Sequence, residues 1–294
     1  MIDICLMGGL GNQMFEYALY KNFECRGIPA EMFIMNQPEK QSGTTALEAA
    51  FPQAEIHWDE DHREYKRLQN QDGRNTIADK VIRRLVFSRR RLVYEKRDGV
   101  FDARVPNITD AALIGYWQTS KYWTGIQSIL QKIFVFSHEY DGLTKKILKE
   151  MGSCESVSIH IRGGDYLTEA TRKIFGGICT PSYYQKAVNI IRSQKKNSVF
   201  FVFSNDRKYA EEILGRKCEF HFVNELINAE YPDWVDMMLM SRCRHHILAN
   251  SSFSWWGAYL GNYQEKIIIA PDQWLNGKGT KDIWEPEWIR IGNK

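Results

Sequence analysis

The stretch V-S-I-H-I-R-G-G-D-Y, residues 157–166, carries the side chains best suited to holding a phosphate group. Its β-branched residues followed by two glycines predict a short buried strand that ends sharply. His160, Arg162 and Asp165 would then lie at or just beyond the C-terminal end of the strand, where open α/β sheets bind ligands. Arg162 offers a permanent cation with a planar fork of donors, and Asp165 could orient it or bind a ribose or base. The alternative is an ordinary tight turn with a surface ion pair.

Two further predicted strands also end in polar residues. The run S-V-F-F-V-F at 198–203 precedes Ser204-Asn205-Asp206, and H-I-L-A at 246–249 precedes Asn250-Ser251-Ser252-Phe253. Carboxyl ends of parallel strands meet at one edge of a sheet, so these groups should converge on a single crevice. Hydroxyls just before a helix suit either capping or phosphate binding. The C-terminal half is therefore expected to bind a phosphate-bearing ligand, a nucleotide.

The chain opens with a predicted strand at 2–7, a glycine loop at 8–12 and a helix at 13–26. Such a loop, together with the N-terminus of the helix behind it, can face an anion. The letters G-G-L-G-N-Q do not fit the G-x-G-x-x-G dinucleotide fingerprint. A structural turn and an anion-binding loop therefore both stay open.

Strands and helices alternate along the rest of the chain, which predicts an α/β fold with parallel sheets covered on both faces. A length of 294 residues permits two domains, and we expect them at 1–150 and 151–294, with a C-terminal tail that could pack back on the first. Further strands are predicted at 31–36, 112–115, 219–223 and 266–270, and helices at 121–134, 181–193, 207–214, 233–243 and 254–260.

Composition excludes several classes of protein. Lys and Arg number 39 against 36 Asp and Glu, a formal net charge of +3, which is too balanced for a dedicated nucleic-acid binder. Six cysteines are scattered without a C-x-x-C pair, as expected in a reducing cytosol. We find no signal-peptide pattern and no apolar run of about 20 residues, so we expect a cytoplasmic protein, at most peripheral to a membrane.

Other motifs are weaker. Asp59-Glu60-Asp61 matches the D-x-D of metal-dependent sugar transferases, but its charged surroundings favour a solvated loop. The basic segment 80–97, from Lys80 to Arg97, could be an amphipathic helix packed on the core or one lying on an anionic membrane surface. Neither a phosphate loop of the G-x-x-x-x-G-K-[ST] type nor a G-x-S-x-G elbow is present. Trp255 and Trp256 are expected in the core rather than as a sugar platform.

Four motifs together resemble glycosyltransferase family 11, the α-1,2-fucosyltransferases, in their bacterial form without a membrane anchor. They are G-G-L-G-N-Q-M-F-E-Y-A at 8–18, H-I-R-G-G-D-Y-L at 160–167, F-V-F-S-N-D at 201–206, and D-M-M-L-M-S with I-L-A-N-S-S-F-S-W-W-G-A-Y-L within 236–260. The resemblance implies a GT-B arrangement of two Rossmann-like domains facing a cleft, the first on the acceptor side. It also implies inverting transfer of fucose from GDP-β-L-fucose to O2 of a terminal galactoside, in surface glycan synthesis, with neither a metal nor another cofactor.

Carried over to this chain, Arg162 would hold the pyrophosphate and stabilise the leaving GDP, and Asp165 would orient Arg162 or the fucose. The base that takes the acceptor proton stays open among Glu169, His160 and Glu16. The remaining donor-binding residues implied by the resemblance are Gly11, Asn12, Ser204, Asp206, Asp236, Asn250, Ser251, Ser252 and Phe253.

Two positions depart from the family pattern. The family usually has two arginines in H-x-R-R-G-D, whereas Gly163 stands at the second, and Asn205-Asp206 replaces the usual Ser-Asp-Asp or aspartate pair. Arg162 is then the sole arginine of that motif. The alternatives to fucose transfer are another GDP-sugar as donor, or a nucleotide- or carbohydrate-binding protein without turnover.

Overall fold

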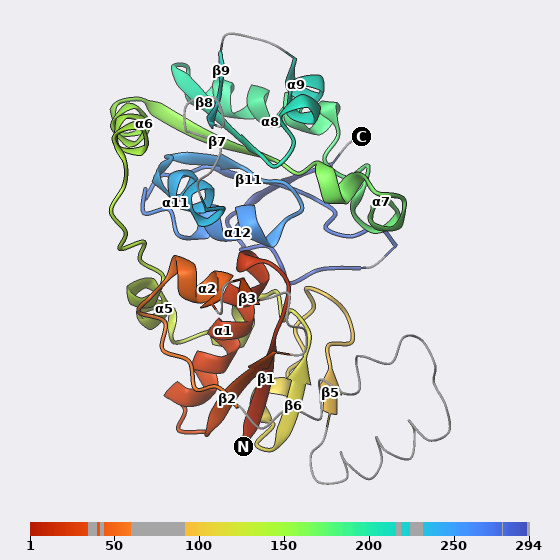
Figure 1. The fold of residues 1–294 in the computed structure, drawn as a ribbon. Helices are drawn as coiled ribbons and strands as arrows, with labels where there is room; N and C mark the ends of the chain where they lie inside the picture. Colours follow the sequence, from red (N-terminus) through yellow and green to blue (C-terminus); the bar gives the residue numbers. More distant parts are fainter. Residues whose placement is uncertain are drawn as a thin grey trace. The chain divides into compact units, whose positions relative to one another are not determined.

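The computed structural model describes residues 1–34, 40–41, 44–59, 92–215, 219–223, 232–277 and 279–292 (Figure 1). The chain forms two compact units. The first comprises Met1–Val135 with Lys281–Ile283, and the second comprises Phe136–Thr280 with Trp284–Lys294. The stretch 136–150, assigned by the sequence to the first domain, thus belongs to the second unit. Lys281–Ile283 join the first unit through Asp282, which accepts a hydrogen bond from the Phe101 N–H at 2.9 Å.

The first unit is built on a four-stranded parallel sheet in the order β2-β1-β6-β5. β1 is buried along its whole length, and helix α1 packs against β1 and β2. The strands are β1 (Ile2–Leu6), β2 (Ala30–Ile34), β5 (Leu92–Tyr94) and β6 (Ala111–Ile114), with the short pair β3 (Lys40–Gln41) and β4 (Thr44–Thr45). The helices are α1 (Leu10–Cys25), α2 (Ala46–Ala50), η3 (Val105–Asn107), η4 (Ser120–Trp123) and α5 (Gln127–Ile133).

The second unit is built on a six-stranded parallel sheet in the order β12-β11-β10-β7-β8-β9. The strands are β7 (Glu155–Ile161), β8 (Ser198–Ser204), β9 (Phe220–Phe222), β10 (His245–Ile247), β11 (Ile268–Pro271) and β12 (Ile289–Ile291). The helices are α6 (Gly142–Ser153), η5 (Gly164–Leu167), α7 (Glu169–Phe175), α8 (Pro181–Gln194), α9 (Arg207–Leu214), α11 (Trp234–Arg242) and α12 (Ser252–Tyr259).

Alternation along β7 divides its side chains between the two faces of this sheet. Val157, Ile159 and Ile161 pack against α8 in one apolar core. His160 points to the opposite face, where its ring lies 5.7 Å from Phe253 of α12. The sheet is therefore covered on both faces, as predicted from the alternating pattern.

Side-chain caps begin four helices of the second unit. Thr180 accepts the Tyr183 N–H at the start of α8, followed by Pro181 in the first turn of the helix predicted at 181–193. Asp206 caps α9 in the same way through the N–H of Tyr209. Such caps satisfy backbone donors that have no partner within the helix and set where each helix begins.

Some expectations were wrong. In place of one helix over 121–134, η4 and α5 are separated by a turn in which Gly125 has φ +97°. Of the basic segment 80–97, residues 80–91 lie outside the described part. Leu92–Tyr94 form strand β5 rather than a helix, because this short apolar run pairs with β6 at the sheet edge. Among the described residues, no helix is long and apolar enough to cross a bilayer.

Candidate functional site

The three polar strand ends of the second unit lie next to one another. β7 pairs with β10 on one side and with β8 on the other, all in parallel, with Ile161 level with Ser204. The chain lays down β7, β8 and β9 in one direction and then crosses back to place β10 beside β7. The gap between the ends of β7 and β10 is therefore the topological switch point, where such sheets bind ligands. The predicted convergence is confirmed.

Asn205 joins the turn after β7 to the turn after β8. Its Oδ1 accepts the Gly163 N–H at 2.9 Å, and its Nδ2 donates to the Gly163 carbonyl at 3.4 Å. A Cβ at position 163 would stand 2.7 Å from Cβ of Asp206 and 3.1 Å from the Tyr209 ring. Glycine thus permits this close approach to the start of α9, and the family's usual second arginine would fit at position 163 only with local repacking.

Arg162 lies over a pair of stacked aromatic rings. Its guanidinium carbon is 5.4 Å from the centre of the Tyr166 ring, which stacks on Phe175 at 4.6 Å. The Tyr166 hydroxyl donates to the carbonyl oxygen of Asn250, at 3.3 Å. This chain of contacts runs across the switch point from β7 to the turn after β10. It holds a half-exposed cation in one place, as a site for an anionic ligand requires.

The N-terminus of α12 supplies the second positive element. Ser251 occupies the N-cap position but forms no cap hydrogen bond within the described chain, unlike the caps of α8 and α9. The first N–H groups of a helix have no partner within the helix, and the helix dipole adds partial positive charge there. Ser252 and Phe253 begin this helix beside His160. Phosphate oxygens are the usual ligands of such an end.

Asn250, Ser204 and Asp206 instead hold the surrounding backbone. The Asn250 amide donates to the carbonyls of Phe175 (3.2 Å) and Trp274 (3.1 Å), so it fastens the end of α7 and the segment after β11 to the switch point. The Ser204 hydroxyl donates to the Asp206 carbonyl at 2.9 Å, and Asp206 caps α9. In this structure these side chains position the site rather than point into it.

The predicted bases differ greatly in accessibility. His160 is buried. Burial lowers the pKa of its imidazole to about 3, and the positive charge of Arg162 contributes to the same shift. Glu16 is fully buried and accepts the Met7 N–H at 2.9 Å. Glu169, in the first turn of α7, is 94% exposed and lies 4.0 Å from Lys173. Glu169 is thus the one that an acceptor could reach.

The remaining predicted residues are placed as follows. Asp165 falls in η5, with its side chain outside the described part. Asp236 lies in the first turn of α11, which packs against α12. Gly11 and Asn12 belong to α1 of the first unit, where Asn12 Oδ1 accepts a hydrogen bond from Gln118 at 2.7 Å.

Three carboxylates of the first unit could hold a metal ion. Oxygens of Asp3, Glu31 and Asp59 lie within 4.8 Å of one another, among the residues that the structure describes. Asp3 and Glu31 are partners in the β1–β2 register, and the Asp59 N–H donates to the Met32 carbonyl at 2.9 Å. Asp59 is therefore half-buried beside β2 rather than in a solvated loop, whereas Glu60 and Asp61 lie outside the described residues. Clusters of acidic groups are common without an ion, and no function is assigned to this one.

The sequence motifs did not reveal Glu95 and Trp117 of the first unit. Both follow the ends of neighbouring parallel strands, β5 and β6, and both line one pocket. The available signal was Gly115, the last residue of the strand predicted at 112–115, because a glycine there permits close packing of another chain segment.

The model of glycosyl transferase family 11 matches residues 96–292 of the chain. The chain belongs to this family. The match covers the whole β7–β10–β8 edge, including Arg162 and the start of α12. The protein is therefore a glycosyltransferase, and its two parallel-sheet units confirm the expected α/β fold class with two Rossmann-like domains of the GT-B type. The predicted cleft between the domains stays a prediction.

Proteins similar in sequence to this chain carry different sugars in their names. An Escherichia coli α-1,2-colitosyltransferase is 38% identical over 60% of this chain, and the match spans 61% of that relative. The E. coli O-antigen biosynthesis glycosyltransferase WbnK is 26% identical over 98% of this chain and 99% of its own length. Galactoside α-(1,2)-fucosyltransferase 1 of Saimiri boliviensis boliviensis is 27% identical over 46% of this chain and 38% of its own.

Solved structures resemble the fold only distantly. Fucosyltransferase NodZ from Bradyrhizobium gives a TM-score of 0.45 at 12% identity, covering 88% of this chain and 93% of that chain. E. coli ADP-heptose lipopolysaccharide heptosyltransferase II gives 0.46 at 11% identity, covering 99% and 89%. Scores at this level assign no activity.

Proposed function

We propose that this family 11 enzyme transfers L-fucose from GDP-β-L-fucose to O2 of a terminal galactoside, with inversion at the fucose anomeric carbon and without a metal ion. The observation that carries the proposal is that Arg162 and the start of α12, whose N-cap side chain forms no cap hydrogen bond within the described chain, both lie at the switch point of the second sheet. Two positive elements at a switch point suit the diphosphate of a nucleotide-sugar. The family supplies the class of reaction.

The acceptor oxygen would attack the anomeric carbon from the face opposite GDP. A bond forms between that carbon and O2 of the galactoside, the bond to the β-phosphate oxygen breaks, and the hydroxyl proton passes to a base. Arg162 and the α12 N–H groups would balance the charge that develops on the departing diphosphate. Preorganised charges of this kind stabilise a transition state more than the ground state.

Glu169 is our candidate for the base. A carboxylate that is 94% exposed can meet the hydroxyl of a large acceptor, whereas buried His160, with a pKa near 3, binds a proton too weakly. Asp165 would orient Arg162 or the fucose, in keeping with its place in η5 directly after the Gly163 turn.

A second donor is supported by a specific observation. The α-1,2-colitosyltransferase is 38% identical in the matched region, whereas the galactoside fucosyltransferase is 27% identical. A colitosyl nucleotide would use the same diphosphate-binding elements. Competition between the fucosyl and colitosyl donors for one acceptor, with product masses read from the same reaction, would show which is preferred.

The test begins with calorimetric titration of the purified protein with GDP. GDP-fucose and lactose are then added in excess EDTA, and the fucosylated product is followed by mass spectrometry. We expect GDP to bind and fucosyl-lactose to form without added metal. GDP binding without fucosyl-lactose would contradict the proposed donor or acceptor. Absence of GDP binding would contradict the proposed site.

A further inference from the structure

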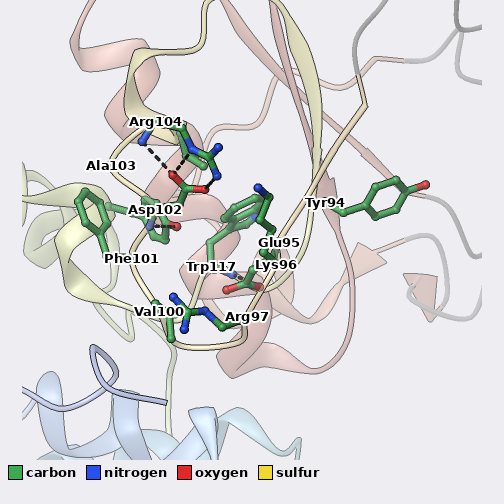
Figure 2. A pocket seen from close by; sticks show the side chains of 12 residues that line it. Tyr94, Glu95, Lys96, Arg97, Val100, Phe101, Asp102, Ala103, Arg104 and Trp117 are labelled. Atoms are coloured by element: carbon green, nitrogen blue, oxygen red, sulfur yellow. Dashed lines mark hydrogen bonds and ion pairs between the residues drawn. The ribbon is translucent and has the colours of Figure 1, made fainter. Parts of the chain in front are cut away.

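A pocket of about 240 Å³ lies at the C-terminal ends of β5 and β6 in the first unit (Figure 2). It is smaller than the roughly 300–1,000 Å³ of sites for drug-sized ligands, so its size suits one sugar ring rather than a nucleotide. Its wall combines aromatic and charged side chains. The lining residues used below are Glu95, Lys96, Arg97, Phe101, Trp117 and Tyr122.

Glu95 is held at one side of this pocket by the backbone after β6. Its Oε2 accepts the N–H groups of Tyr116 at 2.8 Å and Trp117 at 3.0 Å. Gly115 allows this approach, because a Cβ there would lie 2.3 Å from that of Glu95. The other oxygen, Oε1, is buried and, although the Gly99 N–H helps to lower the pKa of this carboxyl, it accepts no well-formed hydrogen bond from any described residue. A buried polar atom left in this state destabilises the fold, and a bound hydroxyl would remove that penalty.

Trp117 presents a matching feature in the same pocket. Its backbone has φ +53°, which bulky residues rarely adopt and which is concentrated at functional sites. The side chain is buried, and Nε1 donates no hydrogen bond within the described chain. Its ring packs edge-on against Tyr122, with centres 5.6 Å apart, and Tyr122 in turn contacts Phe101 at 4.9 Å.

We propose that the Glu95–Trp117 pocket binds a single pyranose ring of the acceptor glycan. The indole N–H of Trp117 and Oε1 of Glu95, which form no well-formed hydrogen bond among the described residues, supply a donor and an acceptor for ring hydroxyls. Half-buried Phe101, packed on Tyr122, supplies apolar surface for the C–H face of a pyranose, and Lys96 and Arg97 at the exposed rim add further donors. The inference rests on the proposed function, since it names where that enzyme holds its acceptor.

The test uses the full-length chain with its tryptophan indoles labelled with ¹⁵N. The chain contains 9 tryptophans, so the Nε1–H signal of Trp117 is identified as the one lost in Trp117→Phe. Methyl β-D-galactopyranoside and the corresponding glucoside serve as probes. We expect one of these sugars to shift the Trp117 signal while leaving that of Trp255, in the core of the second unit, in place.

A second measurement uses the Glu95→Gln variant, which keeps an oxygen for the two N–H groups but turns the free acceptor into a donor. Its affinity for the shifting sugar should fall at least fivefold, while its GDP affinity and its melting temperature at pH 5, where Glu95 of the folded wild type is protonated, stay as in the wild type. Glu55→Gln, at an exposed carboxylate outside the pocket, is the matched control and should change none of the three.

The outcomes separate this inference from the proposed function. If no probe shifts the Trp117 indole, or if Glu95→Gln binds sugar as the wild type does, the pocket is not a sugar site, and ordered water satisfies its two polar atoms. If the wild type nevertheless binds GDP and transfers fucose, the proposed function stands without this pocket. A shifted Trp117 signal in a protein that binds no GDP would instead support the pocket and overturn the donor.

Discussion

The side-chain amide of Asn205 brackets the peptide of Gly163, accepting its N–H at 2.9 Å and donating to its carbonyl at 3.4 Å. This contact fastens the residue after Arg162 to the neighbouring strand end, although the two residues are 42 positions apart in sequence. The position of the Arg162 backbone therefore depends on a side chain from the turn after β8.

Asn205→Ala should weaken donor binding without removing any group proposed to contact the donor. It leaves the Gly163 N–H and carbonyl without their partner, at a cost of about 1–3 kcal/mol, and allows the turn carrying Arg162 to move. We expect lower stability in urea and a GDP affinity reduced about tenfold. Asn189→Ala, at an exposed position on α8, is the matched control. An Asn205→Ala protein with the GDP affinity of the wild type would show that the two Asn205–Gly163 hydrogen bonds do not position the site.

Gly163→Arg, which restores the family's usual residue, should not improve this enzyme. The new Cβ would stand 2.7 Å from that of Asp206 and 3.1 Å from the Tyr209 ring, so the start of α9 must shift. Overpacking of this kind costs about 1–3 kcal/mol. Thermal melting and GDP titration check the expectation, with Gly142→Arg as the control because a Cβ there meets no atom within 4 Å. Tighter GDP binding at an unchanged melting temperature would contradict it.

Glu95 should make the protein less stable as the pH rises towards neutrality. Burial raises its pKa to about 7, against the N–H groups of Tyr116 and Trp117, which lower it. In the unfolded chain Glu95 loses its proton above its ordinary pKa near 4.5, whereas in the folded state it keeps the proton up to about pH 7. The stability that this proton contributes is complete below pH 4.5 and is lost as the pH rises through 7. The other charged or titratable groups around it are Lys96, Arg97, Asp98, Asp102, Arg104 and Tyr122.

The measurement is the free energy of unfolding at pH 5 and pH 8 for the wild type and for Glu95→Gln. The wild type should lose about 3 kcal/mol more than the variant between these two values. Equal losses in the two proteins would mean that Glu95 titrates near its ordinary pKa.

His160 should have the opposite effect in acid. Burial lowers its pKa to about 3, with a further contribution from the charge of Arg162. The unfolded chain binds a proton below pH 6.5 and the folded chain does not, so stability falls as pH decreases from 6.5 towards 3. The imidazole signals of His160 in NMR spectra should stay those of the neutral ring between pH 8 and pH 5. A midpoint near 6.5 would contradict the buried placement. His246 is also buried with a lowered pKa, so its signals must be assigned separately, for example by their loss in His246→Gln.

The alternating apolar runs made the second sheet largely predictable. The strand predicted at 157–161 occurs as Glu155–Ile161, and the predicted helix at 207–214 has those bounds in the structure. The convergence of the polar strand ends followed from parallel topology alone. By contrast, β5 is three residues long and lies in a basic stretch, so local pattern could not separate it from a helix.

The roles of individual side chains were harder to predict, because they depend on partners far away in the sequence. The sequence predicts Asn250 as a ligand-binding residue, whereas in the structure its side-chain amide donates to the carbonyls of Phe175 and Trp274. The sequence predicts His160 as a candidate base, whereas in the structure its imidazole is buried. The Glu95–Trp117 pocket needs two strand ends and a glycine between them, which no single motif contains.

Arg162 provides the most direct test of the central claim, that this family 11 chain transfers sugar by stabilising a departing diphosphate. The turnover number of Arg162→Gln at saturating GDP-fucose, in EDTA, should fall about 100-fold or more. Arg192→Gln, which removes a surface arginine paired with Glu219 on the same unit, should keep wild-type turnover. An Arg162→Gln enzyme with normal turnover once saturated would contradict the claim.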